Sequence, residues 1–164
     1  MRRFLMVLVL VQSLWTVTAQ ASDDLSQIEL RVRCVEPGPC RYAGRMVEVE
    51  LELFNAGKKA VSLPVEYIRQ RGPSVRVHDN HTQRATSLRT TLAAAALREQ
   101  LQVLAPGQSI RFSIPVKPQD ISRFALRPVD VSLEFSINLT PGLSGEDADM
   151  VSSRLRVVGA VGSS

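Results

Sequence analysis

The amino-acid sequence predicts an all-β protein, a sandwich of two antiparallel sheets with about seven to eight short strands. The clearest strand is Met46–Phe54, where every second residue is apolar and glutamates stand between. This period of two is typical of a strand with one buried and one solvent-exposed face. Turn residues recur between such segments, and only Leu92–Leu97 has the composition of a short helix. An immunoglobulin-like arrangement fits this spacing best, although the cysteine–tryptophan–cysteine signature of antibody domains is absent.

The first half of the chain contains four predicted strands. Their bounds are Ile28–Cys34, Met46–Phe54, Ala60–Val65 and Ser74–His78. Asn55–Lys59 is a turn by composition, and Arg69–Pro73 is a predicted loop. Because proline cannot donate to a strand ladder, Pro64 indicates an edge strand or a break in the strand.

The middle of the chain gives the weakest pattern. Thr90 and Thr91 are suitable N-cap residues, and the alanine-rich Leu92–Leu97 behind them consists of strong helix formers. This segment is the predicted helical insert. Outside it, the sequence leaves the path of residues 82–104 open.

A hairpin is predicted after the insert. Ala105–Gln108 places Pro and Gly at the central positions of a type II turn, and alternating apolar residues flank it at 101–103 and 110–114. One helical turn and two strands complete the chain. They are predicted at Asp120–Phe124, Val131–Leu139 and Ser153–Val157.

The N-terminus has the three parts of a secretory signal peptide. Arg2 and Arg3 supply the charge, an apolar block follows, and Ala19–Ala21 forms an A-x-A cleavage site. The apolar block falls short of the ~20 residues that a membrane-spanning helix needs. We therefore expect residues 1–21 to be removed, no stable membrane span afterwards, and a single domain over residues 22–164.

The charge of the chain is modest once this segment is removed. The formal net charge of +4 loses the contribution of Arg2 and Arg3. A nucleic-acid-binding protein normally carries a clustered excess of lysine and arginine, which is not seen here. The sequence therefore predicts a periplasmic or secreted protein that does not bind nucleic acid.

Both cysteines, Cys34 and Cys40, follow the predicted cleavage site. An even number of cysteines in an exported protein indicates a disulfide. The intervening Pro37–Pro39 favours a tight loop. Because a redox or metal role would require Cys-x-x-Cys or nearby histidines, we expect a structural bridge that shapes one loop.

A set of turns and strands follows a recognisable order between Val47 and Val116. In chain order the segments are Asn55–Gly57, Val61–Leu63, Val75–Asp79 and Leu104–Ser109. They resemble small bacterial immunoglobulin-like domains, among them the intracellular proteinase inhibitor family, which has a comparable asparagine turn and a Pro-Gly turn before a late strand. The resemblance implies the fold and brings protease inhibition into consideration. The predicted export and the Leu92–Leu97 insert depart from that family.

His78 and His81 are the candidate metal ligands, since Asp79 and Asn80 lie between them. The same four residues are ordinary turn composition at a strand end, and the sequence contains only 2 histidines. No serine nucleophile with a positioned base and no glycine-rich phosphate loop is recognisable. We therefore predict neither an enzyme nor a cofactor.

The candidate binding residues are Tyr67, Arg69, Arg71 and Pro73. They combine an aromatic ring and two guanidinium groups, types enriched at interface hot spots, with a proline that restricts the loop. An alternative interpretation is that Tyr67 enters the core and the arginines only solvate the turn. Further basic side chains that extend this surface are Arg76, Arg84 and Arg89.

The sequence thus predicts an exported, non-catalytic binding module for a protein partner in the cell envelope, with inhibition as one form of such binding. Two alternatives stay open. One is a periplasmic metal-binding protein that uses His78 and His81. The other is a structural subunit of an envelope assembly, in which the edge strand Ala60–Val65 pairs with a neighbour.

Overall fold

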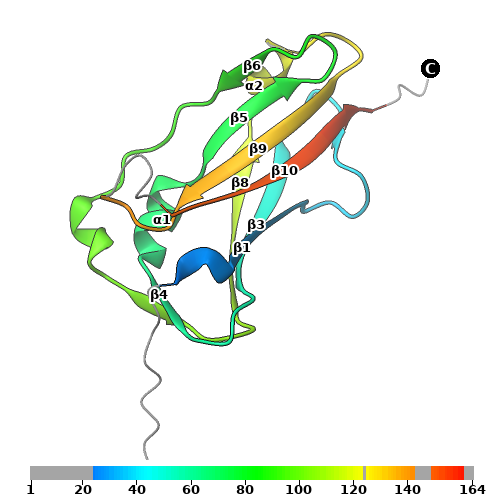
Figure 1. The fold of residues 1–164 in the computed structure, drawn as a ribbon. Coiled ribbons are helices and arrows are strands. Elements are labelled where there is room, and N and C mark those ends of the chain that lie inside the picture. The colour runs from blue at the N-terminus through cyan, green and yellow to red at the C-terminus, as the bar shows by residue number, and fades with distance from the viewer. Residues whose placement is uncertain (1–23, 124, 143–148, 161–164) are drawn as a thin grey trace, which may run out of the picture.

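The computed structural model describes residues 24–123, 125–142 and 149–160. This part of the chain forms ten strands in three sheets (Figure 1). The predicted mostly β fold is therefore confirmed. The predicted signal peptide, residues 1–21, lies outside the described residues.

The first sheet has three antiparallel strands. In spatial order they are β1 (Ile28–Cys34), β3 (Val47–Asn55) and β8 (Ser109–Val116). The central strand β3 has the predicted alternation, because Val49, Leu51 and Leu53 are at most 1% exposed while the glutamates between them face outward. Leu51 lies opposite Val32 of β1 and Phe112 of β8.

The second sheet has five strands. In spatial order they are β2 (Arg41–Tyr42), β10 (Met150–Gly159), β9 (Asp130–Asn138), β5 (Ser74–Asp79) and β6 (Ala85–Ser87). β2 pairs in parallel with β10, and the other pairs are antiparallel. The short strands β2 and β6 were not predicted, because two or three residues are too few to show a period.

The core lies between these two sheets. Apolar side chains of β3 face those of β5 and β9, and Leu133, Phe135 and Val77 are completely buried. β1 lies against β10, so β6 and β8 are the outermost strands on the opposite side (Figure 1). One side of the two layers is thus closed by β1 and β10, and the other is open.

A two-stranded ribbon and a helix lie beyond the two sheets. β4 (Val61–Leu63) pairs with β7 (Gln102–Leu104), and α1 (Val65–Arg71) follows β4 directly. The predicted loop at Arg69–Pro73 is therefore wrong, since it begins with the last turn of a helix. Pro64 is the N-cap of α1 and ends the strand, and Val65 and Ile68 bury one helix face.

Two other predictions are wrong. β7 and β8 do not form a hairpin, because β7 pairs with β4 and β8 with β3. The predicted helix at Leu92–Leu97 is replaced by η2 (Ala95–Arg98), a single 3-10 turn with no buried residue. Good helix formers without an apolar face to bury are marginal in water. The helical turn near Asp120 is present as α2 (Pro118–Ser122), and η1 (Leu25–Gln27) precedes β1.

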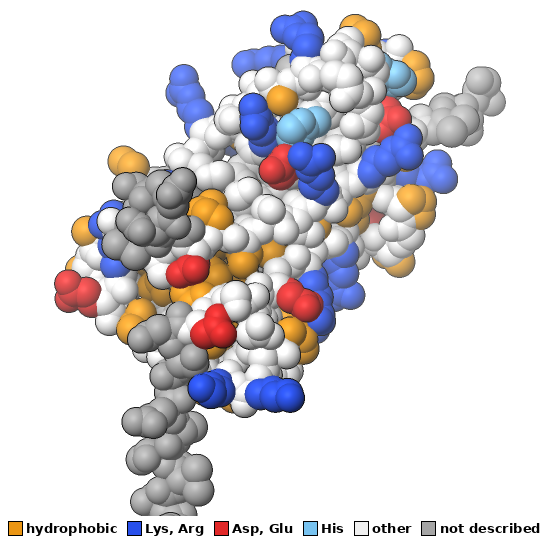
Figure 2. Space-filling model, viewed as in Figure 1, with side chains coloured by type: hydrophobic (Ala, Val, Ile, Leu, Met, Phe, Trp, Pro, Cys, Tyr) orange, Lys and Arg blue, Asp and Glu red, His pale blue; other side chains and the backbone are white. Residues whose placement is uncertain are grey.

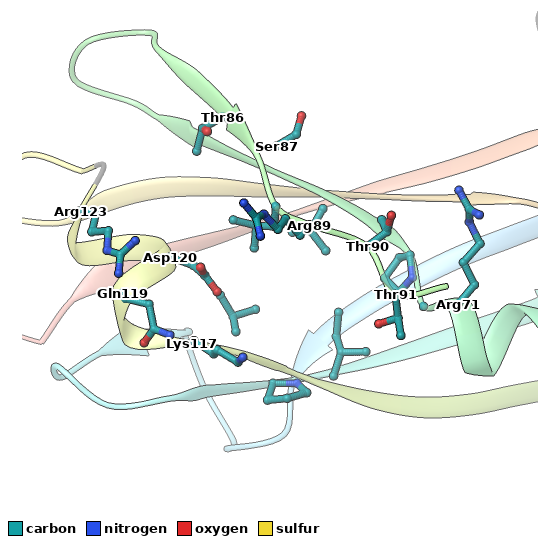
Figure 3. A pocket seen from close by; sticks show the side chains of 17 residues that line it. Arg71, Thr86, Ser87, Arg89, Thr90, Thr91, Lys117, Gln119, Asp120 and Arg123 are labelled. Carbon is teal, nitrogen blue, oxygen red and sulfur yellow. The ribbon is translucent and has the colours of Figure 1, made fainter. Parts of the chain in front are cut away.

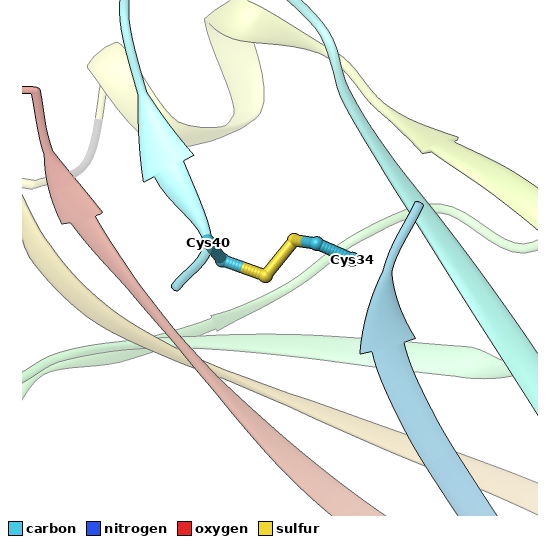
Figure 4. Close-up of a disulfide and its surroundings, with 2 residues drawn as sticks. All are labelled: Cys34 and Cys40. Atoms are coloured by element: carbon cyan, nitrogen blue, oxygen red, sulfur yellow. A yellow bond between two sulfur atoms is a disulfide. The ribbon is translucent and has the colours of Figure 1, made fainter. Parts of the chain in front are cut away.

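The predicted disulfide between Cys34 and Cys40 is confirmed (Figure 4). Cys34 ends β1 of the first sheet, and Cys40 directly precedes β2 of the second. The bridge therefore fixes the crossing of the chain between the two sheets. Its presence is consistent with an oxidising compartment. Among the described residues, no helix is long and apolar enough to cross a membrane.

Candidate functional site

A groove of about 860 Å³ lies on the open side, where β6 and β8 are the outermost strands. One wall consists of the start of β5 and of residues 86–91, which carry several serine and threonine hydroxyls. The end of β8 and α2 form the opposite wall (Figure 3). Three separate stretches of sequence therefore meet at this groove.

The groove is rich in basic side chains. Those that line it are Arg71, Arg89, Lys117 and Arg123, and Asp120 is the one carboxylate among the described lining residues. Arg71 stands near one end and Arg123 near the other, with Arg89 between them (Figure 3). Within the described ranges, none of these four cations takes part in an ion pair. The groove therefore presents a net positive charge to solvent.

Local sequence positions both walls. Arg71 ends α1, and Gly72 follows with φ 69° and ψ 173°, a region that is essentially restricted to glycine. This conformation takes the chain out of the helix and into β5 past the buried Pro73. On the other wall Lys117 is the N-cap of α2, and Pro118 takes the first helical position, where its missing N–H costs no hydrogen bond.

Of the four predicted binding residues, the structure brings two to the groove. Arg71 and Pro73 line it. Arg69 is exposed and pairs with Glu66 of its own helix. Tyr67 is only 3% exposed, so it belongs to the core, which is the alternative interpretation of the sequence. It reaches the core from a helix rather than from a strand.

Tyr67 nevertheless contributes to the site by holding two arginines. Its hydroxyl oxygen accepts hydrogen bonds from Nη1 of Arg71 and Nη2 of Arg98, both at 3.4 Å. The guanidinium of Arg98 also lies 5.2 Å from the ring centroid, within the range of a cation–π contact. Burial raises the pKa of the Tyr67 hydroxyl, but the bonds from Arg98 and Arg71 and their charges outweigh it and lower the pKa. Tyr67 is thus a positioning residue for Arg71.

The other groove cations were harder to find from sequence. Arg89 was indicated as part of a basic surface together with Arg76 and Arg84, and of these three only Arg89 lines the groove. Lys117 and Arg123 carry no sequence signal. They reach the groove only because β8 and α2 lie across from β6, which is a consequence of sheet order.

The two histidines are held by different partners. Nε2 of His78 lies 2.8 Å from a carboxylate oxygen of Glu134, and Nε2 of His81 lies 3.0 Å from the carbonyl oxygen of Pro128. Over the described stretches, no group of three or more histidine, cysteine or acidic residues is placed to hold a metal ion. No observation of the structure therefore favours the metal-binding alternative.

The outer face of the second sheet differs from the groove in its charge balance. Figure 2 shows acidic, basic and histidine side chains together over this face. Arg154 pairs with Glu134 at 2.9 Å, and Arg156 binds both carboxylate oxygens of Asp130 at 2.9 and 2.6 Å. The bonds from Arg156 and then from Asn80 lower the pKa of Asp130. Arg154 and Arg156 are therefore neutralised, whereas the groove arginines have no ion pair among the residues that the structure describes.

Comparisons with known proteins give no family. No protein-family model and no curated protein matches the chain. Among solved structures, the sporulation control protein Spo0M of Bacillus subtilis is 10% identical, with 83% of this chain and 50% of that chain covered and a TM-score of 0.49. A β-glucosidase from Listeria innocua in complex with gluconolactone is 14% identical over 82% and 16% of the two chains, with a TM-score of 0.34.

A structural genomics target, SoR45, is 8% identical over 80% of this chain and 84% of its own, with a TM-score of 0.38. This chain spans about half the length of Spo0M. Because every TM-score here is below 0.5 and every identity is far below 25%, these similarities carry no argument about function. The resemblance to the proteinase inhibitor family stays a prediction.

Proposed function

We propose that this chain is an exported, non-catalytic binding module of immunoglobulin-like architecture, and that it engages a protein partner in the cell envelope through the cationic groove. The groove is the single observation that carries the proposal. Its basic residues have no ion pair within the described part of the chain, whereas Arg33, Arg111, Arg154 and Arg156 on the outer sheet faces have carboxylate partners.

The order of the strands supports the architecture. An immunoglobulin-like domain has strands A, B and E in one sheet and G, F and C in the other, with C′ added beside C in the variable type. When the short strands β2, β4 and β7 are set aside, the chain order β1, β3, β5, β6, β8, β9, β10 can be matched to A, B, C, C′, E, F, G, with β1-β3-β8 and β10-β9-β5-β6 as neighbours in the sheets. Such sandwiches present loops and edges on a rigid frame, which suits binding.

Charge reversal in the groove tests the proposal. The variant Arg89→Glu, Lys117→Glu replaces one exposed cation on each wall. The matched control, Lys58→Glu, Lys59→Glu, makes the same change of charge in the exposed turn after β3. Wild type, variant and control are immobilised and used for affinity capture from envelope and secreted fractions of the source organism.

We expect one protein to be enriched by the wild type and by the control and lost with the groove variant. Its affinity, measured afterwards with purified partner, should fall at least about tenfold for the variant and should weaken with salt. A peptidase as partner would connect the domain to the inhibitor family it resembles. Equal capture by all three proteins contradicts the proposal.

A further inference from the structure

Within the described residues, the outer edge of β8 offers backbone groups that pair with no other strand. The N–H of Val35 donates to the carbonyl of Glu48 at 3.0 Å, so the backbone of Glu48 faces β1. The backbone N–H and C=O groups of successive residues point to opposite sides of a strand. Those of Val49 therefore face β8, where Ile114 is its partner. By the same alternation along β8, the backbone groups of its odd-numbered residues point away from β3. These residues are Ser109, Arg111, Ser113 and Pro115.

No strand of the described residues pairs with this edge. Ser109, Arg111 and Ser113 each present an N–H and a C=O there, and Pro115 presents only a C=O. A row of such groups is a ready template for another strand. Pro115 limits that template to the part of β8 before it.

The apolar side chains beside this edge are only half covered. Phe112 and Ile114 of β8 and Leu88 after β6 are partly buried, whereas Leu51 and Val49 of the neighbouring β3 are fully buried. Because β1 lies against β10, one of the two extra strands of the second sheet, β2, lies on the closed side, and the other, β6, extends past β8. The first sheet of an immunoglobulin-like sandwich of constant type has a fourth strand, D, beside E. Here no described strand takes that position beside β8.

We infer that an extended, acidic segment of the partner protein binds along the free edge of β8 as a fourth strand of the first sheet and continues into the cationic groove. This inference rests on the proposed function and specifies its ligand. The free groups of Ser109, Arg111 and Ser113 pair with the segment's backbone. Beyond Pro115, where pairing stops, Lys117 and Arg89 receive its carboxylates.

A peptide fits this surface better than an anionic polysaccharide. N–H and C=O groups on every second residue of an edge match the spacing of another peptide backbone. Apolar side chains on one face of the added strand would cover Phe112 and Leu88. Antiparallel pairing, as with β3 on the other side of β8, makes the ligand run opposite to β8. The sequence expected of the ligand is therefore a set of acidic residues followed by an alternating apolar stretch.

Defined peptide probes test the inference on the purified full-length chain. The probe is a labelled peptide with blocked ends that carries glutamates in its first half and alternates valine and threonine in its second. Two companions have glutamine in place of glutamate, or N-methyl groups on alternate amides of the second half. Heparin serves as an anionic polysaccharide. Binding is followed by fluorescence anisotropy.

We expect the acidic probe to bind, and the glutamine and N-methylated peptides to bind at least about tenfold more weakly. Ser113→Pro removes one N–H from the outer edge of β8, as Pro115 already does two residues later, and should weaken binding of the acidic probe by a similar factor. If the Ser113→Pro variant does not fold, binding of the N-methylated peptide to the wild type still tests strand pairing. Equal binding of the N-methylated peptide overturns strand pairing, and binding of heparin but of no peptide overturns the choice of ligand.

The outcome is separable from that of the proposed function. If the captured partner depends on Arg89 and Lys117 but the probe does not bind, the inference fails and the proposed function stands. The probe could instead bind the wild type but not the Arg89→Glu, Lys117→Glu variant, while both capture the same protein. The chemistry of the groove then stands, and the captured protein is not its partner.

Discussion

Asn55 is a completely buried polar residue whose side chain joins three parts of the backbone. Its Nδ2 donates to the carbonyl oxygens of Lys59 and Leu104, both at 2.9 Å, and its Oδ1 accepts from the N–H of Gly57 at 2.9 Å. The turn after β3 is thereby tied to the end of β7.

The variant Asn55→Ala should lower the free energy of unfolding by about 3 kcal/mol, because it leaves buried donors and acceptors without partners. Asn55→Asp keeps the acceptor for Gly57 but sets a carboxylate against two carbonyl oxygens, so it should be at least as unstable. Urea denaturation measures both. A loss below about 1 kcal/mol in either variant would contradict this role.

Asp130 makes the stability of the fold sensitive to acid. Bonds from Arg156 and Asn80 lower its pKa in the folded state. A carboxyl with a lowered folded pKa stabilises the fold above its unfolded pKa of ~4, and this contribution is lost as the pH falls towards the folded pKa. We expect the free energy of unfolding to decline below about pH 4.

Asp130→Asn should be less stable than the wild type at pH 7 and should show a smaller decline below about pH 4. The measurement is the urea midpoint as a function of pH for the two proteins. Identical slopes for both would show that another group controls the acid sensitivity.

The exit from α1 depends on Gly72. Its φ of 69° and ψ of 173° are unfavourable for any side chain, although a Cβ there would meet no atom within 4 Å. Gly72→Ala should therefore destabilise the fold by about 1 to 3 kcal/mol through backbone strain alone, and it should disturb Arg71. Thermal unfolding measures the effect. The exposed Ser74→Ala is the matched control, and equal melting of the two variants would argue against strain.

Strands with a long alternating pattern were predicted well, since burial of one face determines both their sequence and their structure. β1 has the predicted bounds, and β3 and β9 are displaced by a single residue at either end. α1 was missed because seven residues after a proline do not show a helical period. The prediction of a hairpin failed because a Pro-Gly turn determines only the local chain reversal, whereas β7 and β8 pair with strands of different sheets.

The groove could be predicted only in part, for a related reason. Arg71 and Pro73 lie in one short segment whose composition is unusual. Lys117 and Arg123 are ordinary surface cations in the sequence, and only the unequal width of the two sheets places them opposite Arg89. Sequence patterns therefore identify one wall, and the sheet order supplies the other.

The closed side of the two sheets, at β1 and β10, and the open side, at β8, have separate tasks. The Cys34–Cys40 bridge lies at β1 and β2, on the side away from β8. Replacing both cysteines by serine should lower the free energy of unfolding by about 2 kcal/mol, because the closed loop is short. Binding of the acidic probe should change less than about twofold at a temperature where the variant is folded. A large loss of binding would show that the two sides are coupled.

Hydrogen exchange at single amides shows whether the edge of β8 and the cationic groove form the binding surface. The rates are measured by NMR with and without the acidic probe. We predict that Ser109, Arg111 and Ser113 exchange more slowly when the probe is bound, while Ile110 and Phe112, already paired with β3, change little. Unchanged exchange at Ser109, Arg111 and Ser113, or protection confined to β1 and the disulfide loop, would show that the probe does not pair with β8.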